Sequence, residues 1–308
     1  MHSATSQRVL VYDVGGSHVA AATCRAGDFA LGRVVQGPHP EEHTSEAFVN
    51  LLEALGQEAV VEAGSAPGAC VAMPGPFDYA AGVSWMQHKL PYLYGFDLRA
   101  ALAERFGWRV EQVRFLNDAA AYLLGEVGAG AAKGCARAVV ITLGTGIGSA
   151  FAVDGRIVTE GCGVPPGGEI WNLPYEGGIV EDQFSTRALR KSYAERTGQE
   201  RDVKTMAMDA AHDEAARAVF ADFGRRLGRM LKRVFAEFAP DVVVVGGGIA
   251  RSAQLFLPFA QQTMDGARFA LLVSALGDHA PLVGAGVAWF AAANTAEAPP
   301  DGPTQQGE

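Results

Sequence analysis

The sequence has few cysteines, no long apolar run and no excess of basic residues. Its four cysteines, Cys24, Cys70, Cys135 and Cys162, lie far apart without a C-x-x-C pair, so the sequence indicates neither a disulfide framework nor a zinc motif. No run of about 18 apolar residues marks a transmembrane helix, and the opening MHSATSQ lacks the apolar core of a signal peptide. The net charge of -9 argues against binding to nucleic acid or an anionic membrane. We therefore expect a cytoplasmic protein with neither partner.

The composition is that of an ordinary globular protein. Hydrophobic residues make up 49% of the chain and charged residues 19%. A chain of 308 residues is long for a single hydrophobic core, which favours two lobes. From about Asn294 the sequence is rich in Pro, Gly and acidic residues, so we expect a disordered tail over residues 294–308.

Two similar segments suggest a repeated structural unit. Residues 8–13 (RVLVYD) form an apolar, β-branched run that VGGSH interrupts before a second apolar run. Residues 138–153 (AVVITLGTGIGSAFAV) have the same order of apolar run, glycine turn and apolar run. Each segment predicts a β-hairpin.

Mixed helical and strand patterns follow each predicted hairpin, which indicates an α/β fold. The expected lobes are residues 1–117 and 118–293, with the ligand site in the cleft between them and the last helix packing back on the N-terminal lobe. Expected helices cover 45–55, 98–106, 181–195, 209–238 and 281–292, and expected strands cover 69–73, 113–116 and 269–273, with a further strand, glycine turn and helix in DVVVVGGGIA.

Three glycine-rich turns follow predicted strands. Such turns can direct several backbone N–H groups at a phosphate because no side chain blocks its approach. No G-x-G-x-x-G opens a helix and no G-x-x-x-x-G-K-[ST] occurs, so neither a Rossmann site nor a Walker A loop is indicated. The turns are Gly15-Gly16-Ser17, Gly144-Thr145-Gly146 and the run containing Gly247 and Gly248.

The pair Asn117-Asp118 stands between an apolar strand and an alanine-rich helix, in RFLNDAAAYLLGE. Both residue types are preferred helix N-caps, because their side-chain oxygens accept from free backbone N–H groups. A carboxylate at this place also suits general base chemistry on a hydroxyl group. Taken alone, the pair favours the helix cap, and the rest of the chain must show whether a substrate binds there.

Together, the motifs resemble those of the ROK family of sugar kinases, within the actin, hexokinase and Hsp70 superfamily. The resemblance extends over roughly residues 8–292. It depends on the order of these segments: YDVGGSHVAAA, MPGPFDYAAG, LPYLYGFDL, LNDAAAYLLGE, ITLGTGIGSAFAVDGRI, GGEIWNLP, GGIVEDQFSTRAL, DVVVVGGGIA and SALGDHAPLVGAG. The resemblance implies a two-lobed actin-like ATPase (ribonuclease H-like) fold with its active site in the interlobe cleft.

The resemblance also implies roles for individual residues. Asp118 would be the general base and Asn117 a sugar ligand, while Asp13 would hold Mg²⁺ partly through water. Gly15, Gly16 and Ser17 from one lobe and Gly144, Thr145 and Gly146 from the other would face the transferred phosphate. Gly247 and Gly248 would lie by the rest of the nucleotide.

Acidic residues in the second half would bind sugar hydroxyls. Glu169 and Glu181 match the two glutamates of the family that do so, since carboxylates accept from paired hydroxyls. Asn172 replaces the histidine of the family's GEIGH segment, and no cysteine cluster follows it, so no structural zinc is expected. Lys89 stands where family members often have Asn, and the sequence leaves open whether it meets an anionic substrate group or solvent.

The resulting prediction is an ATP- and Mg²⁺-dependent, glucokinase-like hexose kinase. Family habit alone suggests a homodimer. One alternative is a polyphosphate-dependent glucokinase, which would need a basic track leading to the cleft. Two further alternatives are a non-catalytic sugar sensor and a ROK transcriptional repressor. We do not expect the repressor, because only about seven residues precede the first strand, too few for its helix-turn-helix. The identity of the sugar stays open.

Overall fold

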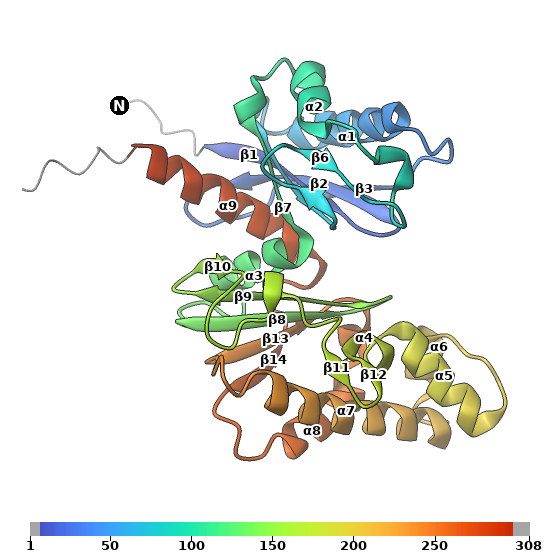
Figure 1. The fold of residues 1–308 in the computed structure, drawn as a ribbon. Coiled ribbons are helices and arrows are strands. Elements are labelled where there is room, and N and C mark those ends of the chain that lie inside the picture. Colours follow the sequence, from blue (N-terminus) through green and yellow to red (C-terminus); the bar gives the residue numbers. More distant parts are fainter. Residues whose placement is uncertain (1–6, 298–308) are drawn as a thin grey trace, which may run out of the picture.

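The computed structural model describes residues 7–297, and they form two α/β lobes (Figure 1). The N-terminal lobe has a five-stranded sheet in the order β3-β2-β1-β4-β7, and the C-terminal lobe has one in the order β10-β9-β8-β13-β14. In each sheet an antiparallel hairpin is followed by two parallel strands. The shared order confirms that one structural plan is used twice.

The first sheet consists of β1 (Arg8–Val14), β2 (His18–Arg25), β3 (Val35–Pro38), β4 (Ala69–Met73) and β7 (Val113–Asn117). Helices α1 (Ser45–Val60) and α2 (Leu98–Phe106) cover one face, and α9 (Ala280–Glu297) packs on the other (Figure 1). The shorter elements of this lobe are β5 (Phe77–Asp78), β6 (Val83–Ser84), η1 (Pro91–Leu93) and η2 (Val110–Gln112).

The second sheet consists of β8 (Arg137–Leu143), β9 (Ile147–Val153), β10 (Arg156–Val158), β13 (Val242–Gly246) and β14 (Ala270–Val273). Helix α3 (Asp118–Ala129) lies on one face, and α7 (Glu214–Val234) and α8 (Ala253–Thr263) lie on the other (Figure 1). The remaining elements are η3 (Pro166–Gly168), β11 (Pro174–Tyr175), β12 (Gly178–Ile179), α4 (Val180–Gln183), α5 (Thr186–Thr197), α6 (Val203–Asp209), η4 (Gly248–Ser252) and η5 (Gly277–His279).

Each lobe has its own apolar core. Because helices cover both faces of the sheets, central strands such as β13 and β4 are buried along their whole length. In the C-terminal lobe, five fully buried phenylalanines join the sheet to the outer helices, and each contributes about 2–3 kcal/mol of hydrophobic stabilisation. They are Phe184, Phe220, Phe223, Phe235 and Phe256.

Helices α3 and α9 cross closely and join the lobes. A Cβ atom at Gly125 would overlap the carbonyl oxygen of Ala280, and one at Gly284 would overlap that of Ala121. Helix α9 also contacts β1, β2 and β4 of the N-terminal lobe. The glycines therefore allow the two backbones to approach at the junction between the lobes.

Several expected elements end elsewhere than predicted. The expected helix over 181–195 is two helices, because Phe184 has φ -124° and ψ 52° and Ser185 then caps α5. The expected helix over 209–238 begins only at Glu214, after the separate helix α6. Helix α9 continues to Glu297, so the tail predicted from residue 294 began too early, and residues 298–308 lie outside the described part.

Within residues 7–297, no helix combines the length and apolarity needed to cross a bilayer.

Candidate active site

The pair Asn117-Asp118 lies at the junction of β7 and α3, at the cleft between the lobes. The Asn117 Oδ1 atom accepts from the backbone N–H of Ala120 at 3.1 Å, so Asn117 is the N-cap of α3. Its Nδ2 atom donates to the hydroxyl of Tyr79 at 3.2 Å. Asp118 accepts from the next backbone N–H, that of Ala119, at 2.8 Å, and the Asn117 side chain also acts on its carboxylate. Asn117 is therefore the cap of α3, and the neighbouring residue, Asp118, provides the carboxylate.

Burial raises the pKa of Asp118 above its usual value. The backbone N–H of Ala119 and the ammonium group of Lys89 partly oppose this rise. Lys89 itself is exposed, yet its charge acts on the Asp118 carboxylate. The site therefore contains one partly desolvated carboxylate with a cation nearby.

Asp13 ends β1 on the same edge of the sheet as Asp118. Strands β1, β4 and β7 are parallel neighbours, so their carboxyl ends meet at that edge. Burial, followed by the negative charges of Asp118 and Asp278, raises the pKa of Asp13 to about 7. Asp278 comes from η5 of the other lobe. The charges of two other carboxylates, one from each side of the junction between the lobes, thus act on Asp13.

The raised pKa of Asp13 predicts a pH-dependent stability. Because the pKa of Asp13 is raised to about 7 by folding, the folded protein binds the proton more tightly and loses stability as the pH rises from about 4 to about 7. We expect Asp13→Asn to raise the free energy of unfolding by about 2–4 kcal/mol at pH 8 and by little at pH 4. Thermal unfolding of both proteins across this range measures the difference, and an equal effect at both pH values would contradict the assignment.

The first glycine turn, Gly15 to Ser17, joins β1 and β2. The Gly15 N–H donates to the carbonyl of His18 at 2.9 Å, and the Gly15 carbonyl accepts from Nε2 of His39 at 2.8 Å. The His39 ring stacks on Phe48 at 6.0 Å between centroids. His39 therefore fixes the backbone of this turn from the end of β3. Sequence reasoning missed it, because no motif around His39 indicates a contact 24 residues away.

The second turn, Gly144 to Gly146, joins β8 and β9 and lies against Glu181. The Gly144 carbonyl accepts from both the N–H and the hydroxyl of Thr186, each at 2.8 Å. Glu181 Oε2 accepts from the N–H of Ile147 at 3.3 Å, and a Cβ atom at Gly146 would overlap this oxygen. The structure thus brings a predicted sugar ligand, Glu181, into contact with a predicted phosphate turn.

The third turn lies beside the second. Gly247 has φ 82°, and a Cβ atom there would lie 2.5 Å from the carbonyl oxygen of Leu143, the last residue of β8. Only glycine avoids both the strained φ and this collision. Gly248 follows at the start of η4, with open space around its Cα atom.

The loop with Glu169 and Asn172 is exposed and held by one serine. The hydroxyl of Ser149 donates to the Gly168 carbonyl at 2.7 Å and accepts from the Ile170 N–H at 3.1 Å, which fixes the backbone on both sides of Glu169. The Glu169 carboxylate accepts from Nε1 of Trp171 at 2.8 Å. Its charge also helps to raise the pKa of Tyr79, so the loop faces the N-terminal lobe across the cleft.

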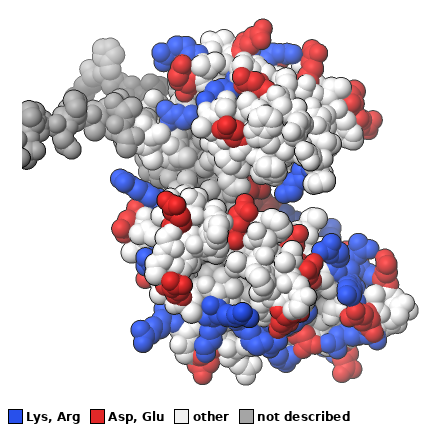
Figure 2. Space-filling model, in the orientation of Figure 1, with Lys and Arg blue, Asp and Glu red and all other residues white. Residues whose placement is uncertain are grey.

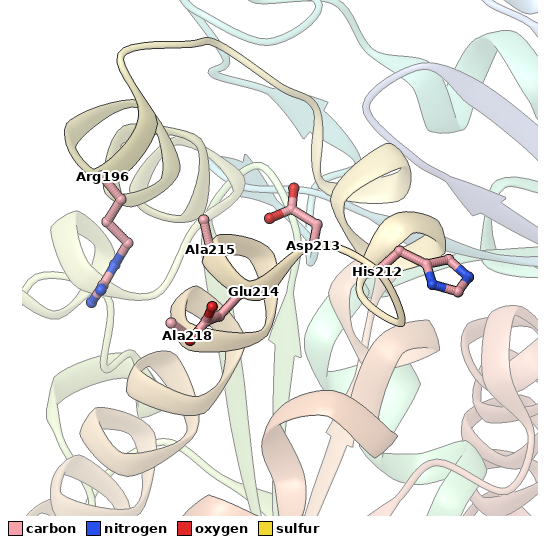
Figure 3. A pocket seen from close by; sticks show the side chains of 6 residues that line it. All are labelled: Arg196, His212, Asp213, Glu214, Ala215 and Ala218. Atoms are coloured by element: carbon pink, nitrogen blue, oxygen red, sulfur yellow. The ribbon is translucent and has the colours of Figure 1, made fainter.

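The hollow between the two lobes is visible in Figure 2, with acidic and basic side chains at its edges. A second hollow, of about 600 Å³, lies far from it at the α5–α6–α7 corner, where Arg196 and His212 occupy opposite ends (Figure 3). Its other lining residues are Asp213, Glu214, Ala215 and Ala218. Asp213 is already used as the N-cap of α7, so this corner offers no convergent set of free polar groups. The interlobe site is therefore the candidate active site.

Comparisons with known proteins agree with this fold and motif order. A model described as "ROK family" matches residues 9–292. A glucokinase of Thermotoga maritima is 27% identical over 284 residues, covering 84% of this chain and 87% of that protein, and a fructokinase of Zymomonas mobilis is 29% identical over 224 residues, covering 66% and 70%. A ROK hexokinase structure from Thermus thermophilus has a TM-score of 0.77 at 27% identity, covering 94% of this chain and 100% of that one.

Proposed function

The chain belongs to the ROK family, and from this premise we propose that it is a sugar kinase that transfers the γ-phosphoryl group of ATP to a hexose hydroxyl. The actin-like two-lobed fold expected from the sequence is confirmed by the family match and by the ROK hexokinase structure. The single observation that carries the proposal is Asp118, a partly desolvated carboxylate at the start of α3, close enough to Asp13 for its charge to act there.

Asp118 is proposed as the general base. Its Oδ1 atom accepts from the Ala119 N–H, which fixes the carboxylate and leaves Oδ2 for the acceptor hydroxyl. Burial moves the pKa of Asp118 upward from its usual value, and a more basic carboxylate is a better acceptor for the proton of the sugar hydroxyl. The Lys89 ammonium group opposes a large rise.

The glycine turns are proposed to hold the phosphate chain. The turn at Gly15, Gly16 and Ser17 and the turn at Gly144, Thr145 and Gly146 belong to different lobes, so closure of the lobes brings their N–H groups together around the γ-phosphoryl. Closure also excludes water, which would otherwise compete for the phosphate.

The nucleotide end is proposed at Gly247 and Gly248, at the turn between β13 and η4. The open space beside Gly248 leaves room for a ligand.

The donor set around Asp13 fits a magnesium ion. Mg²⁺ prefers oxygen ligands, keeps several waters and commonly takes one protein carboxylate together with substrate phosphates. Burial and the charges of Asp118 and Asp278 raise the pKa of Asp13 to about 7, and a bound cation would offset both effects by stabilising the ionised carboxylate. Bound there, Mg²⁺ would neutralise charge on the phosphates. The described residues contain no cluster of three or more metal-ligating side chains, which is in keeping with a site completed by substrate and water.

The sugar is proposed to lie between Asn117, Glu169, Asn172 and Glu181. Three of these are carboxylate or amide side chains on the C-terminal lobe, and Asn117 ends the sheet of the N-terminal lobe. Glu181 touches the phosphate turn at Gly146, so the sugar and the phosphoryl group would meet there. Because Glu169 and Asn172 are exposed in the unliganded protein, a sugar has access to both.

The test is a product assay with two donors. Purified protein with Mg²⁺ and a panel of hexoses is given either ATP or polyphosphate, and the phosphorylated sugar is identified by mass spectrometry. We expect product with ATP and one or a few sugars, and none when Mg²⁺ is removed by chelation. If product forms with polyphosphate and not with ATP, polyphosphate is the donor. If no product forms with either donor, the proposed function is contradicted.

A further inference from the structure

Tyr79 lies beside Asn117 at the candidate sugar site, in the MPGPFDYAAG segment, and the sequence analysis assigned it no role. It follows the β5 strand, in the turn before β6. Its hydroxyl donates to the carbonyl of Met73 at 3.1 Å and accepts from Nδ2 of Asn117 at 3.2 Å. Met73 ends β4 and Asn117 ends β7, so the hydroxyl bridges the carboxyl ends of two neighbouring strands. That edge of the sheet is where the proposed base, Asp118, begins α3.

The Tyr79 side chain is held rigidly. Arg99 donates to the backbone carbonyls of Tyr79 at 3.1 Å and of Ala80 at 2.6 Å, which fixes the turn. The ring of Phe77 packs against the Tyr79 ring at 5.4 Å between centroids. Because backbone, ring and hydroxyl are all anchored, the hydroxyl has one defined position.

The hydrogen bonds also fix the direction of the Asn117 amide. Its Oδ1 atom is used by the Ala120 N–H, so its NH₂ group must face Tyr79, and a flipped amide would lose both contacts. Tyr79 therefore acts on Asn117 as a positioning residue.

The tyrosine hydroxyl has one proton and two lone pairs. Its proton is used by Met73 and one lone pair by Asn117, so the remaining lone pair can only accept. The negative charges of Asp118 and of Glu169 from the opposite lobe both act on this hydroxyl, which agrees with a position between the two lobes. A sugar hydroxyl can donate to such a group, whereas a deoxy carbon cannot.

Resting on the proposed kinase function, we infer that Tyr79 is a specificity-determining residue, whose hydroxyl accepts a hydrogen bond from one hydroxyl of the sugar. The site should therefore discriminate against the one monodeoxy sugar that lacks that hydroxyl. Discrimination arises because the deoxy sugar would leave the hydroxyl of Tyr79 without its partner in a closed, dry cleft.

The experiment measures the dissociation constants of the best-bound hexose and its set of monodeoxy analogues by titration calorimetry, with wild type, Tyr79→Phe and Tyr92→Phe. Tyr92→Phe is the matched control, since the Tyr92 hydroxyl is buried in the same lobe without a hydrogen-bond partner among the described residues. Thermal unfolding of each variant checks that it is folded.

We expect wild type and Tyr92→Phe to bind one monodeoxy analogue about tenfold more weakly than the parent sugar, and Tyr79→Phe to bind the two within about twofold. An unchanged preference in folded Tyr79→Phe, or an equal loss for every sugar, would overturn the inference. Since binding is measured without turnover, a protein that binds sugars with this pattern but forms no sugar phosphate would contradict only the kinase proposal. A wild type that binds no hexose would overturn both.

Discussion

Asp118→Asn is expected to lower kcat for sugar phosphorylation by about 10³-fold, within the range by which general bases contribute, while sugar affinity changes only a few-fold. The amide keeps the shape of the side chain and the contact with the Ala119 N–H, but it cannot take the acceptor proton. Because burial raises the pKa of Asp118, removing its charge should not lower the melting temperature. Coupled ADP release gives kcat, and calorimetry gives the sugar dissociation constant.

The matched control is Asp182→Asn. Asp182 is an exposed carboxylate on α4 that pairs with Arg187 at 3.2 Å and belongs to no predicted contact with sugar or phosphate. We expect its kcat to stay within about twofold of wild type, because exposed ion pairs contribute little. A kcat for Asp118→Asn that matches this control would remove Asp118 from the role of base.

Gly284→Ala is expected to destabilise the protein by about 2–5 kcal/mol, the range of severe overpacking. The added methyl group would overlap the Ala121 carbonyl on α3, and a helix backbone cannot move aside as a side chain can. Since α3 carries Asp118 at its first position and α9 packs on both lobes, separating the helices should also lower activity in the folded fraction. Denaturant unfolding measures the first effect.

Gly128→Ala is the matched control at the same crossing of helices. Its added methyl group would meet mainly a Val287 methyl group, 2.6 Å away, which can rotate. A smaller loss, about 1 kcal/mol or less, is expected after the gain in helix propensity is included. Equal stability of the two variants would mean that the backbones of α3 and α9 do not limit each other.

The repeated hairpins and the predicted cap at Asn117 were readable from the sequence because both depend on local chemistry. Apolar alternation around a glycine turn specifies a hairpin, and an amide before an alanine-rich run specifies a helix start. The structure places Asn117 as that cap, and it leaves Asp118 for the proposed chemistry. The local pattern could not show which residue of the pair is the helix cap and which is available for chemistry. That distinction also depends on the contact between Asn117 and Tyr79, which are 38 residues apart in the sequence.

The remaining site residues depend on tertiary contacts that no local pattern carries. His39 reaches Gly15 only because β3 pairs at the edge of β2, and Tyr79 reaches Asn117 only because β4 and β7 are neighbours. The division of the expected helix over 181–195 has a similar cause. Phe184 is fully buried in the C-terminal core, and this packing overrides the continuous helical pattern.

The most direct test of the proposed function is ³¹P NMR of a reaction containing the protein, ATP, Mg²⁺ and one hexose. The account predicts a new sugar phosphate resonance that grows as the γ-phosphate resonance of ATP declines, and that is absent when hexose is omitted or when Asp118→Asn replaces wild type. If ATP is consumed at the same rate with and without any hexose, or is not consumed at all, the protein is not the sugar kinase proposed.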